Sequence, residues 1–386
     1  MLFNSFLLAG FEGSTGYNLH RQWIDQVEAT QHDRFADEDY RRLVEVGIRA
    51  VRESVRWSLV DRKDFYDFSS LEPFINASRK YTIEIIFDLF HFGYPDFIDL
   101  FSQDFPKRFA GYCYATATYI SENVPGILYF TPINEPSYFS WAAGEVGLFA
   151  PYAIGRGYEL KVQLVKAAIQ GINAIRAACR RARIVTVDPI CHVSAPLDRP
   201  DLQAEADAFN QNAVYQAWDM LSGKLAPELG GSRTHLDIVG VNYYWTNQWE
   251  MGKEGEALKD ADPRHCSLSR LLDDVWQRYG ATILLTETSQ VGDLRPIWMN
   301  QLIHEVKIVL ESQIPLQGVC LYPILGMPEW HQRDLWTQMG MWDLELREGE
   351  LVRLPFTPMI EAAKDFQLFE KQLSQTAVSH ALRYSR

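Results

Sequence analysis

Two stretches decide the fold predicted for this chain: Thr131-Pro132-Ile133-Asn134-Glu135-Pro136 and Leu284-Leu285-Thr286-Glu287-Thr288. Each places a glutamate directly after an apolar run, at the point where a buried strand would give way to a loop. A carboxylate at the end of a hydrophobic strand is costly to bury unless it is paired or used in chemistry. Two such carboxylates on two strands are what general acid/base and nucleophilic chemistry at an acetal carbon requires.

Short apolar or β-branched runs recur along the chain, and longer amphipathic segments lie between them. The runs are residues 6–11, 50–57, 83–90, 127–133, 183–187, 236–244, 282–286 and 318–322. The helical patterns include residues 37–46, 105–122, 159–181, 204–221, 268–279 and 296–311. This alternation predicts an α/β protein with a (β/α)8 TIM barrel. Residues 83–90 do not alternate polar with apolar positions, as expected of a strand buried on both faces.

No low-complexity linker or sequence repeat divides the 386 residues, so we expect a single (β/α)8 barrel domain over residues 1–386. We place its core at residues 1–355 and a C-terminal helix and tail at residues 356–386. The N-terminal run lacks a basic flank and a clear cleavage site, so it is interpreted as the first strand. No run approaches the ~20 apolar residues that a membrane-spanning helix needs.

The composition limits the kinds of partner. The formal net charge of −13 repels phosphate backbones and anionic lipid, so neither nucleic acid nor a membrane is an expected partner. The five cysteines are scattered without CxxC spacing, at Cys113, Cys179, Cys191, Cys266 and Cys320. This pattern argues against a disulfide framework and a zinc cluster, and it favours reduced thiols in a cytoplasmic protein. We expect no metal and no cofactor, and the oligomeric state stays open.

Polar residues gather where the predicted strands end, which is where barrels of this kind place their reacting groups. They include Glu12, Arg52, Asp88, His91, Asn134, Glu135, Asn242, Tyr244 and Glu287. The candidate site residues are therefore sought among these strand-end positions. Asp188 and His192 also follow a strand, but nothing else in the sequence supports a functional role, so structural roles are expected for them.

Glu135 and Glu287 are the candidate catalytic residues. A retaining glycosidase needs one carboxyl group as acid/base and one carboxylate as nucleophile, about 5–5.5 Å apart and in different environments. Asn134, directly before Glu135, is placed to bind the sugar hydroxyl next to the anomeric carbon. Arg52 and Tyr244 are candidates to hold Glu287 ionised and oriented.

Several segments resemble glycoside hydrolase family 1, the β-glucosidase type, from the first strand to about residue 344. They are residues 51–58 (VRESVRWS), 91–95 (HFGYP), 105–110 (FPKRFA), 134–136 (NEP), 239–244 (VGVNYY) and 329–330 (EW). The resemblance implies a barrel enzyme that acts on β-glycosides, with Glu135 as acid/base and Glu287 as nucleophile. It further implies that His91, Glu329 and Trp330 bind the glycone.

The chain departs from the family pattern around the glycone. Thr288-Ser289 stand where the family has Asn-Gly after the nucleophile, and Gly10 stands where a glycone-binding glutamine is expected. Tyr322 replaces a tryptophan, and Pro328 replaces an aromatic residue. The pair of glutamates stays intact, so the sequence predicts a divergent member with a reshaped glycone pocket.

Three of the candidate residues keep a second interpretation. Arg52 can instead pair with Glu53 or Glu84 in the barrel wall, and His91 can be a buried core histidine. Glu12 is either a sugar ligand or a carboxylate neutralised by Arg52.

The sequence predicts a retaining β-glycoside hydrolase that is exo-acting on a small β-glycoside, so its partner is a small-molecule carbohydrate. The predicted site has Glu135 and Glu287 as catalytic residues and Asn134, His91, Arg52, Tyr244, Glu329, Trp330 and Glu12 as substrate-binding residues. A transglycosidase that passes the sugar to an alcohol is the first alternative. A catalytically inactive sugar-binding protein is the second, motivated by the altered residues after Glu287.

Overall fold

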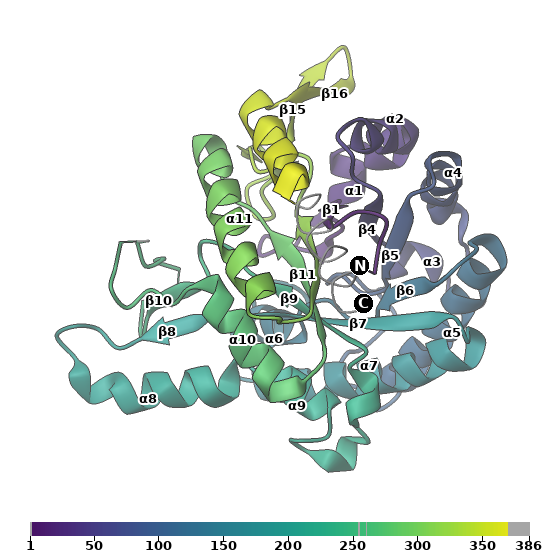
Figure 1. The fold of residues 1–386 in the computed structure, drawn as a ribbon. Helices are drawn as coiled ribbons and strands as arrows, with labels where there is room; N and C mark the ends of the chain where they lie inside the picture. Colours follow the sequence, from purple (N-terminus) through teal and green to yellow (C-terminus); the bar gives the residue numbers. More distant parts are fainter. Residues whose placement is uncertain (1, 254, 260, 370–386) are drawn as a thin grey trace, which may run out of the picture.

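The computed structural model describes residues 2–253, 255–259 and 261–369. Within this part of the chain, eight strands form a closed barrel in which neighbouring strands are parallel (Figure 1). Around the barrel they are β1 (Leu7–Gly10), β4 (Ala50–Ser54), β5 (Glu84–Asp88), β6 (Leu128–Thr131), β7 (Ala182–Pro189), β9 (Ile238–Asn242), β11 (Thr282–Thr288) and β12 (Leu316–Leu321). This (β/α)8 TIM barrel confirms the predicted fold, and every predicted run overlaps one barrel strand.

Helices surround the barrel (Figure 1). The longer ones are α2 (His32–Glu45), α4 (Glu72–Tyr81), α5 (Phe105–Asn123), α7 (Gly157–Ala178), α10 (Leu268–Tyr279) and α11 (Arg295–Glu311). The short ones are α1 (Gln26–Ala29), α3 (Trp57–Val60), α6 (Pro136–Phe139), α8 (Gln203–Ala208) and α9 (Gln216–Leu221), and residues 357–369 are also helical. Among the described helices, none is both long enough and apolar enough to cross a membrane.

Four small strand pairs lie outside the barrel. They are β2 (Thr15–Tyr17) with β3 (Trp23–Asp25), β8 (His192–Ser194) with β10 (Gln248–Glu250), β13 (Met327–Pro328) with β14 (Trp336–Thr337), and β15 (Trp342–Arg347) with β16 (Glu350–Pro355) in the described residues. The single-domain organisation stays a prediction. Residues 370–386 of the predicted C-terminal tail lie outside the described residues.

Residues 204–221, predicted as one helix, are interrupted. A π-helical turn, Phe209–Ala213, separates α8 from α9. The side chain of Asn210 in this turn accepts the N–H of Val193 and donates to its carbonyl, each at 2.8 Å. These bonds tie the turn to β8, a tertiary contact that the periodicity of the segment does not report.

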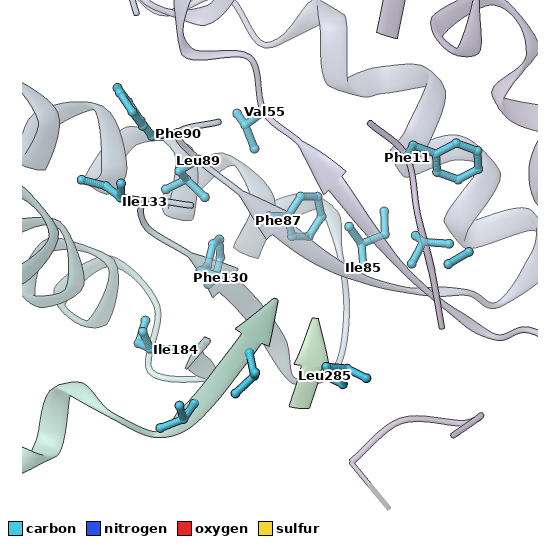
Figure 2. Close-up of a cluster of buried hydrophobic side chains, with 14 of the residues drawn as sticks. Phe11, Val55, Ile85, Phe87, Leu89, Phe90, Phe130, Ile133, Ile184 and Leu285 are labelled. Atoms are coloured by element: carbon cyan, nitrogen blue, oxygen red, sulfur yellow. The ribbon is translucent and has the colours of Figure 1, made fainter. Parts of the chain in front are cut away.

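The barrel strands are buried on both faces, as predicted for residues 83–90. Ile86 of β5 packs with Leu8 and Tyr129 in a cluster that fills the barrel. Its neighbour Phe87 belongs to a second cluster between strands and helices, where it lies 6.0 Å from the Phe130 ring (Figure 2). Truncating one such buried ring costs about 3–5 kcal/mol. These two clusters pack against both faces of the strands and hold them in place, with their carboxyl ends together at one end of the barrel.

A buried charged network outside the barrel joins α2 to β4. His32 Nδ1 lies 2.9 Å from Asp39, and its Nε2 lies 3.0 Å from Glu53. Arg353 contacts Asp39 through Nε at 2.8 Å and Nη2 at 2.9 Å, which fastens the β15–β16 hairpin beside α2 (Figure 1). Burial alone would lower the pKa of His32, but Glu53 and Asp39 outweigh it and raise this pKa to about 9. The imidazolium charge compensates the buried carboxylates.

This network predicts a pH-dependent stability. The unfolded imidazole has a pKa of about 6.5, so the stabilisation by His32 is complete below about pH 6.5 and is lost as the pH rises towards the folded value. The difference between the folded and unfolded pKa values of His32 corresponds to about 3 kcal/mol in the free energy of unfolding. Replacing His32→Gln should remove this dependence, so the unfolding free energies of variant and parent, measured in urea, should converge with rising pH. A constant difference across the range would contradict the protonated state assigned to His32.

Candidate active site

Both strand-end glutamates lie at the carboxyl ends of their strands and are buried. Glu287 is the second-last residue of β11, and Glu135 directly precedes α6. Glu135 is 9% and Glu287 is 4% exposed. The backbone of Glu135 has φ 45° and ψ 60°, a left-handed conformation that is uncommon for a residue with a side chain. Backbone strain of this kind is often found at functional sites.

Glu287 contacts the two residues that were predicted to accompany it. The hydroxyl of Tyr244 donates to Glu287 Oε2 at 2.8 Å, and Arg52 Nη1 donates to Oε1. Positive charge and a neutral donor thus lie against the two carboxylate oxygens. Such charge-assisted contacts stabilise and orient an anionic nucleophile.

Arg52 lies inside the barrel and not in its wall. Its Nη2 donates to Asp88 Oδ2 and to Asn134 Oδ1, each at 2.6 Å. Glu53 instead bonds to His32 and Tyr40 in the outer network. The alternative in which Arg52 pairs with a wall glutamate is therefore wrong.

Glu135 has different surroundings. Asn242 Nδ2 donates to Glu135 Oε1 at 2.8 Å, and Asn242 Oδ1 accepts a bond from Thr286 at 2.6 Å, which fixes the amide orientation. Burial first, and then the negative charge of Glu287, raise the pKa of Glu135 well above its usual range. One carboxyl group thus favours its proton while the other contacts a cation. Acid/base and nucleophilic roles need this difference.

His91 belongs to the same polar cluster. Its Nδ1 donates to Asp88 at 2.9 Å, and its Nε2 faces Asn134 Nδ2 at 3.2 Å. The amide of Asn134 is held in this orientation because its oxygen accepts from Arg52. His91 is thus buried within the predicted site, among polar partners, and not in the apolar core.

Glu12 lies beside His91. Its Oε1 accepts the N–H of Ser14 at 2.8 Å and lies 3.7 Å from His91 Nε2. Burial raises the pKa of Glu12, and the charge of His91 opposes this. Arg52 makes its bonds to other groups, so the interpretation in which Arg52 neutralises Glu12 is wrong.

Two departures from the family 1 pattern are coupled in space. A Cβ atom added at Gly10 would lie 2.0 Å from Cδ2 of Tyr322. The Tyr322 ring occupies that space, stacked 5.9 Å from the His91 ring, with Arg52 Cζ 5.3 Å from its centroid. Its hydroxyl accepts the N–H of Gly13 at 3.3 Å. Residue 10 can contribute no side chain to the site because Tyr322 fills its place.

Glu329 and Trp330 follow β13. Glu329 Oε2 accepts the N–H of His331 at 2.6 Å and that of Gln332 at 2.9 Å, which shapes this loop. The Trp330 ring packs edge-on against Phe92, 5.9 Å between centroids. Phe92 directly follows His91 in sequence, so this loop borders the cluster.

Tyr138 of α6 connects these groups and was not predicted. Its ring lies 6.1 Å from that of Trp330. Burial first, and then the charges of Glu135, Glu329 and Glu12, raise the pKa of Tyr138, so its phenol lies among the three carboxyl groups. The sequence gives no signal for it, because its place depends on how the short helix after Glu135 turns.

Two further residues of the site were recognised as strand-end residues but left out of the predicted set. Asp88 joins Arg52 to His91, and Asn242 bonds to Glu135. Both follow the strand-end rule that identified the two glutamates. Applying that rule to every strand would have included them.

A cavity of about 160 Å³ borders this region. Phe92 and Phe149, whose rings both pack against Trp330, line it together with Tyr17 and Trp23. Neither catalytic candidate is among its lining residues. Among the described residues, no group of three or more His, Cys, Asp or Glu side chains is arranged to hold a metal ion.

Comparison with known proteins reveals similarity at the level of structure. No protein-family model matches the chain, and no curated protein matches it. The family 1 β-glucosidase from Thermotoga maritima aligns with a TM-score of 0.74 at 13% sequence identity, covering 94% of this chain and 97% of that chain. This chain has the fold of the family 1 β-glucosidases.

Two more solved structures support this. The AHE enzyme from Alicyclobacillus herbarius aligns with a TM-score of 0.74 at 17% identity, covering 94% of this chain and 98% of that chain. The Thermotoga maritima β-glucosidase in complex with glucoimidazole gives a TM-score of 0.73 at 13% identity, covering 94% and 97%. Similarity at such low identity concerns the fold, so the roles of the side chains rest on the geometry of this site.

The surroundings of Glu135 predict two opposite changes in its titration. Replacing Glu287→Gln removes a nearby negative charge and should lower the pKa of Glu135. Replacing Asn242→Ala removes a bond that favours the ionised form, so the pKa should rise. Carbon-13 NMR titration of labelled glutamate carboxyl groups measures both. Shifts of the same sign in the two variants would contradict these surroundings.

Proposed function

We propose that this protein is a retaining β-glycoside hydrolase, a divergent member of glycoside hydrolase family 1 that removes a sugar from a small β-glycoside. One observation carries the proposal: two buried carboxyl groups lie at the carboxyl ends of two barrel strands, in different electrostatic surroundings. Burial favours the proton on Glu135, while Arg52 and Tyr244 bond to the oxygens of Glu287. A retaining mechanism requires this division of roles.

The reaction takes two steps. In the first, Glu287 attacks the anomeric carbon and Glu135 donates its proton to the leaving oxygen, which releases the alcohol and leaves a glycosyl-enzyme ester. In the second, Glu135 removes a proton from water, which attacks the same carbon and frees Glu287. Two inversions give a sugar with retained configuration.

The residues around the pair offer groups suited to a sugar. Asn134, His91 and Glu12 present amide, imidazole and carboxylate groups in one bonded cluster. Glu329 and Trp330 add a carboxylate and an aromatic face, which suit sugar hydroxyls and the apolar face of a pyranose. Structures of the Thermotoga maritima β-glucosidase are solved in complex with glucoimidazole and with deoxynojirimycin. Its similarity in fold supports a β-glycoside as the substrate class.

Replacing Glu287→Gly tests the nucleophile. Hydrolysis of aryl β-glycosides should fall by about 10⁴-fold or more, because the covalent step is lost. Added azide should restore part of the turnover by direct displacement, and it should give the α-glycosyl azide because a single displacement inverts the anomeric centre. NMR of the product reads the configuration.

A matched control uses a glutamate far from the site. Glu348 is exposed in the β15–β16 turn and has φ 51°, a conformation that glycine adopts readily. Glu348→Gly should retain parental activity. Full activity of Glu287→Gly on each substrate that the parent cleaves would refute the assignment.

Replacing Glu135→Ala tests the acid/base. The rate should fall by roughly 10²–10⁴-fold on glycosides with poor leaving groups, which need protonation, and far less on dinitrophenyl glycosides. Azide should now give the β-glycosyl azide, because the first inversion at Glu287 is followed by a second. An equal loss on all leaving groups would show that Glu135 is not the acid.

The same assays separate the alternatives. Products that carry an added alcohol in preference to water would identify a transglycosidase. A protein that binds sugars but neither turns over aryl glycosides nor becomes labelled at Glu287 by a fluorosugar would be a sugar-binding protein without activity.

A further inference from the structure

Asp188 is a buried carboxyl group that the proposed mechanism does not use. It lies near the end of β7 and is 0% exposed. Both of its oxygens accept bonds from Ser137: Oδ1 from the backbone N–H at 3.0 Å and Oδ2 from the hydroxyl at 2.6 Å. A fully buried acid that bonds twice to one residue holds that residue in place.

Ser137 is the second residue after Glu135. The backbone of Glu135 is left-handed, with φ 45° and ψ 60°, and its N–H donates to the carbonyl of Val187 at 3.1 Å. Val187 directly precedes Asp188, so β7 holds the chain on both sides of Glu135. A left-handed residue with a side chain persists only where its surroundings fix it. The bonds from Asp188 supply that restraint on the α6 side.

We propose that Asp188 is a positioning residue for Glu135. Asp188 acts through Ser137 on the backbone next to Glu135, and through its own charge on the proton that Glu135 carries as the acid/base. This inference rests on the proposed function. It assigns a role to a residue for which the sequence indicated only a structural one.

The charge of Asp188 reaches Glu135 through a buried region. The titratable groups that face Asp188 are Glu135, Cys191 after β7 and Lys161 of α7. Burial raises the pKa of Asp188 to about 7, although Ser137 and Lys161 oppose this. Ionised Asp188 raises the pKa of Glu135 in turn. Asp188 therefore gains its charge near neutral pH and helps Glu135 to keep its proton as the pH rises.

Asp188→Asn separates charge from geometry. An asparagine oxygen can still accept the Ser137 N–H, and its amide can donate to the Ser137 hydroxyl, so the turn is retained while the charge is lost. The alkaline limb of kcat/KM for an aryl β-glycoside should move to lower pH by roughly half a unit or more, with kcat at the optimum nearly unchanged. Asp201→Asn is the matched control, because Asp201 is exposed and pairs with Arg199 at the surface; it should leave the profile unchanged.

Asp188→Ala removes the bonds as well. It should lower kcat tenfold or more on substrates with poor leaving groups, while a dinitrophenyl glycoside is affected far less, because only the placement of the acid is disturbed. Ser137→Ala keeps the charge and the backbone bond. The alkaline limb of its kcat/KM profile should stay closer to that of the parent than the limb of Asp188→Asn does. Ser137→Ala takes the place of Asp188→Ala in this comparison if Asp188→Ala does not fold.

The titration of Glu135 gives a readout that needs no turnover. Carbon-13 NMR of labelled glutamate should show a lower pKa for Glu135 in Asp188→Asn than in the parent. If the parent cleaves no glycoside, the proposed function fails while this shift still reports on Asp188. If the parent is active and both the pH profile and the Glu135 titration of Asp188→Asn match the parent, the role of Asp188 is overturned.

Discussion

The arrangement of the site depends on one buried guanidinium. Arg52 is 1% exposed and cannot shed its proton, so its charge must be compensated inside the barrel. It bonds to Asp88, Asn134 and Glu287, which follow or end strands on both sides of the barrel. Removing one of these partners would leave buried charge unpaired, a costly change. The same contacts that make the cation tolerable therefore set the position of the candidate nucleophile.

This cation contacts only some of the buried carboxyl groups in the site. Arg52 bonds directly to Glu287 and Asp88, whereas Glu135 has a neutral amide donor and Glu12 has a serine and a histidine. Neither Glu135 nor Glu12 bonds to a guanidinium, and burial raises the pKa values of both. Two glutamates at strand ends thus acquire different surroundings from one asymmetric contact. Their chemical identity alone does not distinguish them.

The sequence predicted the parts of the site that follow from the barrel rule. Strand ends identified Glu135 and Glu287, and Arg52 and Tyr244 were expected beside the nucleophile; both bond to it. What could not be predicted depends on contacts between residues far apart in the chain. The helix break at Asn210 needs β8, and the place of Tyr138 needs the turn that Asp188 holds. Local periodicity contains no information about either contact.

The exchange at Gly10 and Tyr322 shows how such a site can change without losing its electrostatics. The ring of Tyr322, directly after β12, fills the space that a side chain at Gly10 of β1 would need, so Gly10 cannot gain a side chain while Tyr322 keeps its place. Burial first, and then the charges of Glu12 and Glu287, raise the pKa of Tyr322 well above its usual range, which keeps the phenol neutral. A neutral ring adds no charge beside Arg52. The wall therefore differs from the family 1 pattern in the residues that shape it, while Glu135 and Glu287 are both present.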